Sequence, residues 1–159
     1  MGGVGGRTRA RARVVAMETH ALLPQAGYSG REVGTWAGCQ AAVLRRLCQR
    51  VVTLEREPAL AEHASETLAR LGFDNVEVAV ADGSLGWPAS APYDMILVAC
   101  ATPDVPSALV DELAPAGRLI IPLGRAEDKH KDSRRYQREG GELVARPMIT
   151  EGCVPQRTG

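Results

Sequence analysis

Residues 32–55 read EVGTWAGCQAAVLRRLCQRVVTLE, in which a glycine-bearing turn, a helical pattern and a strand pattern follow one another. Between residues 40 and 49 the apolar residues recur at helical spacing, and Arg45 and Arg46 fall on the opposite face. The β-branched run at 51–54 follows directly and ends at Glu55. A crossover helix that feeds straight into a strand is typical of a βαβ unit, so we predict an α/β fold with a parallel sheet.

The same alternation continues towards the C-terminus. The apolar run at 95–99 has the composition expected of a strand that is covered on both faces. Gly140 and Gly141 separate two segments that can pair as an antiparallel hairpin. The further elements that we expect are helices over 14–23, 58–71 and 105–113, strands over 76–80, 93–101 and 118–123, a turn over 115–117, a charged loop over 127–131, and a hairpin of 134–138 with 142–149.

Length and composition bound the class of protein. A chain of 159 residues has room for one domain, which we expect over 14–159, preceded by a disordered basic tail over 1–13 that contains four arginines and no acid. Basic and acidic residues balance at 19 each, so nucleic acid is not an expected partner. No segment approaches the roughly 20 apolar residues that span a bilayer, so no membrane association is expected.

The cysteines and histidines do not indicate a metal site. Four cysteines are scattered without a Cys-x-x-Cys pair, so we expect neither zinc nor a disulfide framework. His20, His63 and His130 are expected at the surface, and Trp87 is expected to pack the loop that follows residues 82–83. We therefore predict a soluble, cytoplasmic protein with no metal.

Polar or glycine residues stand at the ends of three successive predicted strands. They are the turn that contains Gly34 and Gly38, the carboxylate of Glu55, and the pair Asp82-Gly83. Open α/β sheets bind ligands outside the carboxyl ends of their strands, and a carboxylate at the end of the second strand can accept ribose hydroxyls. Taken singly, each is also compatible with an ordinary turn or an exposed acid. A nicotinamide-dependent oxidoreductase is an alternative, but the chain has no Gly-x-Gly-x-x-Gly run.

From about residue 14 onwards the sequence resembles the protein-L-isoaspartate O-methyltransferase family. DGSLGWP at 82–88 is the most diagnostic stretch. The other matching stretches, in the family's order, are GTxxGxQAAVL at 34–44, VVTLER at 51–56, DNV at 74–76, APYD at 91–94, LAPAGRLIIPLG at 113–124 and VP at 154–155. The resemblance implies a Rossmann-like methyltransferase fold, with a mostly parallel, doubly wound sheet and an antiparallel C-terminal hairpin.

The resemblance also implies a reaction, methyl transfer from S-adenosylmethionine to the free carboxylate of L-isoaspartyl residues in damaged proteins or peptides, by a protein expected to be monomeric. A carboxylate with a pKa of about 4 is ionised at neutral pH, so alignment rather than a strong base is required. We name no catalytic residue. The residues implied to bind the cofactor are Glu32, Gly34, Thr35, Gly38, Glu55, Arg56, Asp82 and Gly83.

The chain departs from the family in three places. Residues 1–13 do not resemble the family's Thr-Ile-Ser-Gln-Pro-like segment, whose serine contributes to the active site. A catalytically inert module that binds S-adenosylmethionine is therefore the alternative function. Gly30-Arg31 replace two apolar residues of the first strand, and because an unpaired buried charge costs several kcal/mol, we expect that strand to be shortened or frayed. Trp36-Ala37 replace Gly-Ser, so that the indole either narrows the cofactor turn or folds outward.

Overall fold

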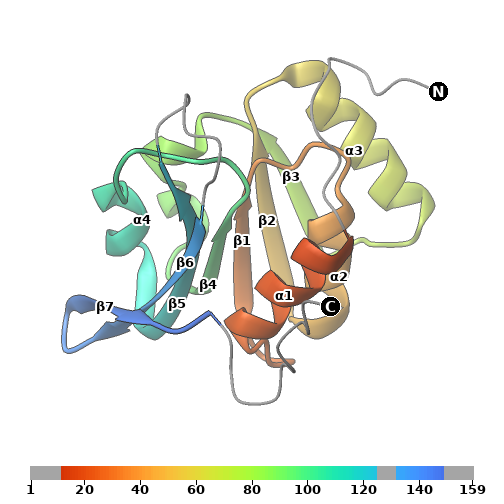
Figure 1. Cartoon of the computed structure of the whole chain (residues 1–159). Coiled ribbons are helices and arrows are strands. Elements are labelled where there is room, and N and C mark those ends of the chain that lie inside the picture. The colour runs from red at the N-terminus through yellow and green to blue at the C-terminus, as the bar shows by residue number, and fades with distance from the viewer. Residues whose placement is uncertain (1–11, 125–131, 149–159) are drawn as a thin grey trace, which may run out of the picture.

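The computed structural model describes residues 12–124 and 132–148 of the chain (Figure 1). The basic tail expected over 1–13 therefore falls almost wholly outside the described residues, as do the charged loop, His130, Cys153 and the pair at 154–155. In chain order the elements are α1 (Ala12–Leu22), β1 (Ser29–Val33), α2 (Cys39–Leu47), β2 (Arg50–Glu55), α3 (Pro58–Arg70), β3 (Val76–Val80), the 3-10 helices η2 (Gly83–Leu85) and η3 (Pro88–Ser90), β4 (Tyr93–Val98), α4 (Ser107–Asp111), β5 (Leu113–Leu123), β6 (Asp132–Glu139) and β7 (Glu142–Arg146).

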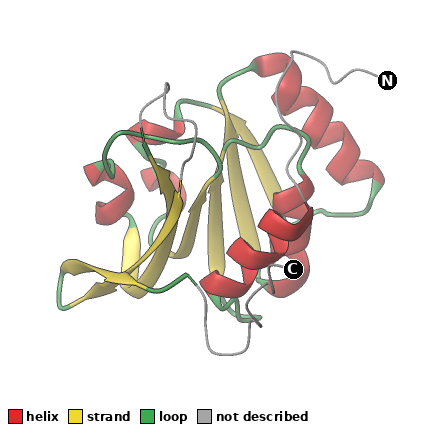
Figure 2. Ribbon diagram, viewed as in Figure 1, coloured by secondary structure: helices red, strands yellow, loops and turns green. Residues whose placement is uncertain are grey.

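The seven strands form one sheet in the order β3-β2-β1-β4-β5-β6-β7 (Figure 2). Strands β1 to β5 run parallel, whereas β6 pairs antiparallel with both β5 and β7. The predicted α/β fold with a C-terminal hairpin is thus confirmed. β1 and β4 are neighbours although two strands intervene in the chain, so the strand order reverses at β1, where open α/β sheets bind ligands.

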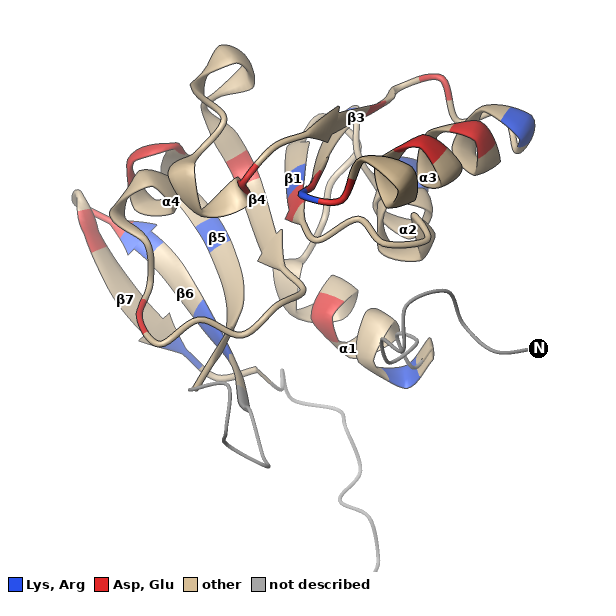
Figure 3. Ribbon diagram, turned by 90° about the horizontal axis from the view of Figure 1, so that it is seen from above, with Lys and Arg blue, Asp and Glu red and all other residues tan. Residues whose placement is uncertain are grey.

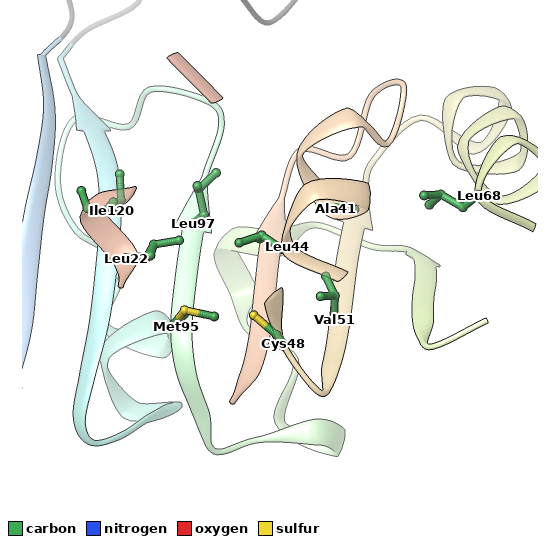
Figure 4. Close-up of a cluster of buried hydrophobic side chains, with 10 residues drawn as sticks. Leu22, Ala41, Leu44, Cys48, Val51, Leu68, Met95, Leu97 and Ile120 are labelled. Atoms are coloured by element: carbon green, nitrogen blue, oxygen red, sulfur yellow. The ribbon is translucent and has the colours of Figure 1, made fainter. Parts of the chain in front are cut away.

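Each face of the sheet has its own apolar core. One cluster joins Ala21 and Leu22 of α1, Leu44 of α2 and Leu68 of α3 to side chains of the sheet (Figure 4). The other cluster lies on the opposite face, where Leu109 of α4 packs with buried residues of β1, β2, β4 and β5. The sheet is therefore covered on both sides, which accounts for the nearly continuous apolar runs of its central strands.

The expectation that β1 is shortened or frayed is wrong. The strand is complete over Ser29–Val33 and pairs along its length with β2 and with β4. Arg31 is fully buried, but it forms an ion pair with Glu112, the residue between α4 and β5, so that the buried charge is compensated.

Two segments near the C-terminus differ from the expected bounds. α4 is shorter than predicted, because Pro106 precedes its first turn and the chain enters β5 at Leu113. The turn expected over 115–117 lies inside β5 as an irregularity, at which the pairing with β4 skips from Leu113 to Arg118. Ala116 there has a left-handed φ of 62°. Residues 115–117 do turn the chain, but they bend one strand instead of separating two elements.

Candidate functional site

The turn after β1 is held against β2 by its own backbone. Gly34 has a φ of 97°, and its N–H donates to the carbonyl of Leu54 over 2.8 Å. Gly38, with a φ of 76°, caps α2, and a Cβ there would lie 3.2 Å from Leu68 of α3. Both positions require a conformation that glycine adopts at little cost, so the turn follows a path close to the sheet.

Glu55 links the end of β2 to this turn. One carboxylate oxygen accepts from the N–H of Trp36 at 3.0 Å, and the other accepts from the N–H of Glu57 at 3.1 Å. The side chain is buried, whereas that of the neighbouring Arg56 is exposed. An ionised carboxylate offers about four acceptor sites, so Glu55 retains capacity for hydroxyl donors of a ligand.

Asp82 and Gly83 follow the end of β3. Oδ1 of Asp82 accepts from both the hydroxyl and the N–H of Ser84, and these bonds lower the pKa of the carboxyl group. Asp82 is exposed, and among the residues that the structure describes no donor reaches its Oδ2. Gly83 is buried against β1, because a Cβ at this position would lie 2.5 Å from Cγ1 of Val33.

Backbone hydrogen bonds place these groups at one edge of the sheet, which Figure 3 views from above. The N–H of Ala81 donates to the carbonyl of Glu55 over 2.9 Å, just as that of Gly34 donates to Leu54. Just beyond the end of β4, the N–H of Ala99 likewise donates to the carbonyl of Val33 over 2.8 Å. The ends of β1, β2 and β3 therefore meet at this edge, as the sequence predicts for Gly34, Glu55 and Asp82.

Glu32 and Thr35 lie beneath the turn. Glu32 is 1% exposed and accepts a hydrogen bond from the hydroxyl of Thr53 at 2.6 Å, and that hydroxyl also contacts the hydroxyl of Thr35 at 2.6 Å. Burial raises the pKa of Glu32 to about 8, with smaller contributions from Glu55 and Glu18. The carboxyl of Glu32 thus supports the turn from inside the protein, whereas that of Asp82 is exposed.

Sequence reasoning missed the residues that hold the loop after β3. A guanidinium nitrogen of Arg31 donates to the carbonyl of Gly83 at 2.6 Å, and Glu112 accepts both from Arg31 and from the N–H of Trp87. An arginine in a central strand signals that a buried acid must be near. The sequence could not identify Glu112 as that acid, because 81 positions separate the two.

The remaining predictions concern residues and features that lie elsewhere in the protein. His20 and His63 are exposed, Trp87 packs against the core on the α4 side, and both predictions are confirmed. Within the described residues no group of three or more His, Cys, Asp or Glu could hold a metal ion, and no helix is long and apolar enough to cross a bilayer. A cavity of about 660 Å³ lies between α1 and α2 and is lined in part by Thr19, Leu47 and Arg118. None of its lining residues belongs to the site at the strand ends.

A family model described as protein-L-isoaspartate(D-aspartate) O-methyltransferase matches residues 4–156. The chain belongs to this methyltransferase family. A curated relative of Azorhizobium caulinodans, a protein-L-isoaspartate O-methyltransferase, is 42% identical over 154 residues, which are 97% of this chain and 70% of the relative. Protein-L-isoaspartate O-methyltransferase 1 of Syntrophobacter fumaroxidans is 50% identical over 111 residues, 70% of this chain and 52% of the relative.

Solved structures of the family share the fold. A protein-L-isoaspartate O-methyltransferase superposes with a TM-score of 0.81 at 25% identity, over 96% of this chain and 51% of that one. A putative member from Plasmodium falciparum, solved in complex with S-adenosyl-L-homocysteine, superposes with a TM-score of 0.73 at 22% identity, over 91% of this chain and 73% of that one. The chain spans about half the length of several curated methyltransferases that it matches.

Proposed function

We propose that this protein binds S-adenosylmethionine and methylates the free carboxylate of L-isoaspartyl residues in damaged proteins or peptides. The observation that carries the proposal is the convergence of the glycine turn, Glu55 and the Asp82-Gly83 pair at one edge of a sheet with the family's fold. The names of the curated relatives support the reaction, and the ligand in the solved Plasmodium structure supports the cofactor.

The residues at this edge fit an adenosyl group. Glu55 is hydrogen-bonded by two backbone amides and can still accept the ribose hydroxyls, and Oδ2 of Asp82 can accept from an adenine amino group. The turn at Gly34 and Gly38 lets backbone approach the ligand closely. We include Glu32 and Thr35 as the support of this turn from below, and Arg56 as an exposed residue next to Glu55 at the same edge.

When bound, S-adenosylmethionine supplies a methyl group carried on a sulfonium. In the overall reaction an oxygen of the isoaspartyl carboxylate bonds to the methyl carbon and the carbon–sulfur bond breaks, which leaves a methyl ester and S-adenosylhomocysteine. The substrate carboxylate is already ionised at neutral pH, so this chain need not supply a general base. The role of these side chains is to bind and orient the cofactor, and orientation alone can accelerate such a transfer greatly.

The test is to incubate the purified chain with methyl-labelled S-adenosylmethionine and an isoaspartyl peptide, and to count base-labile methyl ester. The matched control is the same peptide with a normal aspartyl residue. We expect ester with the isoaspartyl peptide only. Ester no higher than in the control would reject the activity. Cofactor binding in a parallel calorimetric titration would then favour the second candidate, an inert module that binds S-adenosylmethionine.

The proposal extends to a monomer that acts on proteins in the cytoplasm. Among the described cysteines Cys39, Cys48 and Cys100 are free thiols, as expected of a reducing compartment. Light scattering coupled to size-exclusion chromatography tests the oligomeric state. A mass near 16.9 kDa is expected, and twice that value would contradict the proposed monomer.

A further inference from the structure

A buried ion pair connects the centre of β1 to both ends of the loop at residues 83–87. Arg31 is fully buried and pairs with Glu112, whose side chain is 8% exposed. Arg31 also donates to the carbonyl of Gly83 over 2.6 Å, at the start of the loop. Glu112 accepts from the N–H of Trp87, at the end of the loop. Two side chains thus hold two backbone groups that lie four residues apart.

The loop is shaped to lie directly on this pair. Gly86 has a φ of 90°, and a Cβ there would lie 2.5 Å from Oε1 of Glu112. A Cβ at Gly83 would meet Val33 at 2.5 Å, so the loop also lies flat on the end of β1. The ring of Tyr93 covers the guanidinium of Arg31 at 5.7 Å, and its hydroxyl donates to the carbonyl of Trp87 over 2.9 Å. The guanidinium of Arg31 is therefore shielded from solvent.

Stability alone does not account for such an arrangement. Buried ion pairs can often be replaced by apolar residues of similar volume without loss of stability, whereas removal of one partner alone is strongly destabilising. What an apolar pair cannot do is bind a carbonyl and an amide in defined directions. The distinctive contribution of Arg31 and Glu112 is therefore the position of the loop backbone.

We propose that Arg31 and Glu112 are positioning residues that hold the loop at 83–87, and with it Asp82, in the conformation that receives the adenine end of the cofactor. This inference rests on the proposed cofactor site. Asp82 immediately precedes the anchored carbonyl of Gly83, and a small displacement of the loop moves its carboxylate. The pair thereby sets cofactor affinity without contacting the cofactor.

The deciding variant is the double substitution Arg31→Leu with Glu112→Gln. Leucine restores an apolar β1, and the glutamine oxygen still accepts from Trp87, but the donor to Gly83 is lost. We expect cooperative unfolding near the wild-type midpoint, faster amide exchange over residues 82–87 without ligand, and S-adenosylhomocysteine bound about tenfold more weakly, as for loss of a charged hydrogen bond. Ile120→Ala, on the opposite face of the sheet, controls for lost stability alone, and we expect its loop exchange and affinity to be unchanged.

Each outcome decides the proposal. Wild-type loop exchange in a double variant that is folded would overturn it, and so would wild-type affinity. If the double variant does not fold, Arg31→Lys is measured in the same way, since one ammonium can pair with Glu112 but cannot also serve Gly83 as the planar guanidinium does. If wild-type protein does not bind S-adenosylhomocysteine, the proposed function fails, whereas loop exchange still reports whether the pair positions the loop.

Discussion

Glu32 is a buried carboxyl group whose titration affects folding. Its pKa is raised from 4.5 to about 8, chiefly by burial. Between these pH values the folded state holds a proton that the unfolded chain releases, so the free energy of unfolding falls as pH rises, by at most about 1.4 kcal/mol per pH unit. The contribution of this group is favourable below pH 4.5 and is lost as pH passes 8.

Glu32→Gln is expected to flatten this pH dependence. The amide cannot ionise, and its oxygen still accepts from Thr53. Urea unfolding at pH 6 and pH 8 measures the difference, with Glu62→Gln on the exposed face of α3 as the control. A residual slope of the same sign is expected from Glu18, whose pKa is also raised by burial. If the free energy of unfolding of Glu32→Gln depends on pH as steeply as that of wild type, Glu32 is not the group responsible.

Trp36 occupies a backbone position that suits glycine. Its φ is 45°, in the left-handed region, where a side chain costs roughly 1–2 kcal/mol. Comparing Trp36→Gly with Trp36→Ala separates this strain from the bulk of the indole, because both variants lack the indole and only glycine relieves the backbone. We expect the glycine variant to be the more stable by about 1 kcal/mol in urea unfolding. Equal stabilities would show that the turn carries no strain at this residue.

At the scale of the elements, α3 supports the glycine turn through Leu68. Leu68 is 2% exposed and packs where Gly38 begins α2, so helix α3 limits how far the glycine turn can move. Leu68→Ala is expected to lower the free energy of unfolding by about 2–5 kcal/mol and also to weaken cofactor binding. Glu66→Ala, on an exposed position of the same helix, is the matched control. Chemical unfolding measures the stability and calorimetry measures the cofactor affinity. If Leu68→Ala is less stable but binds the cofactor as tightly as wild type, α3 does not influence the site.

At the scale of the whole molecule, a ligand that binds only the folded state must stabilise all of it. S-adenosylhomocysteine at 100 times its Kd adds about 2.7 kcal/mol, which for a chain of this size raises the melting midpoint by about 5–11 °C. We expect no shift with NAD at the same concentration, because no Gly-x-Gly-x-x-Gly run follows β1. Differential scanning fluorimetry measures both. A larger shift with NAD would point to the oxidoreductase alternative.

The sequence by itself determined the α/β class, the C-terminal hairpin and the family, because hydrophobic period and turn residues are local signals. The order of Gly34, Glu55 and Asp82 at successive strand ends could also be read from it, since all parallel strands end at one edge of the sheet.

Only the tertiary structure decided what happens at Arg31. From the sequence, an arginine in β1 predicts a frayed strand, and the outcome depends on Glu112, 81 residues away. The tertiary structure likewise decided that the turn before Arg118 bends β5 instead of following the end of a helix, because β5 pairs with β4 on both sides of that turn. In both cases the deciding interaction joins residues that are distant in the chain, and a single sequence contains no local signal for which distant partner a residue will meet.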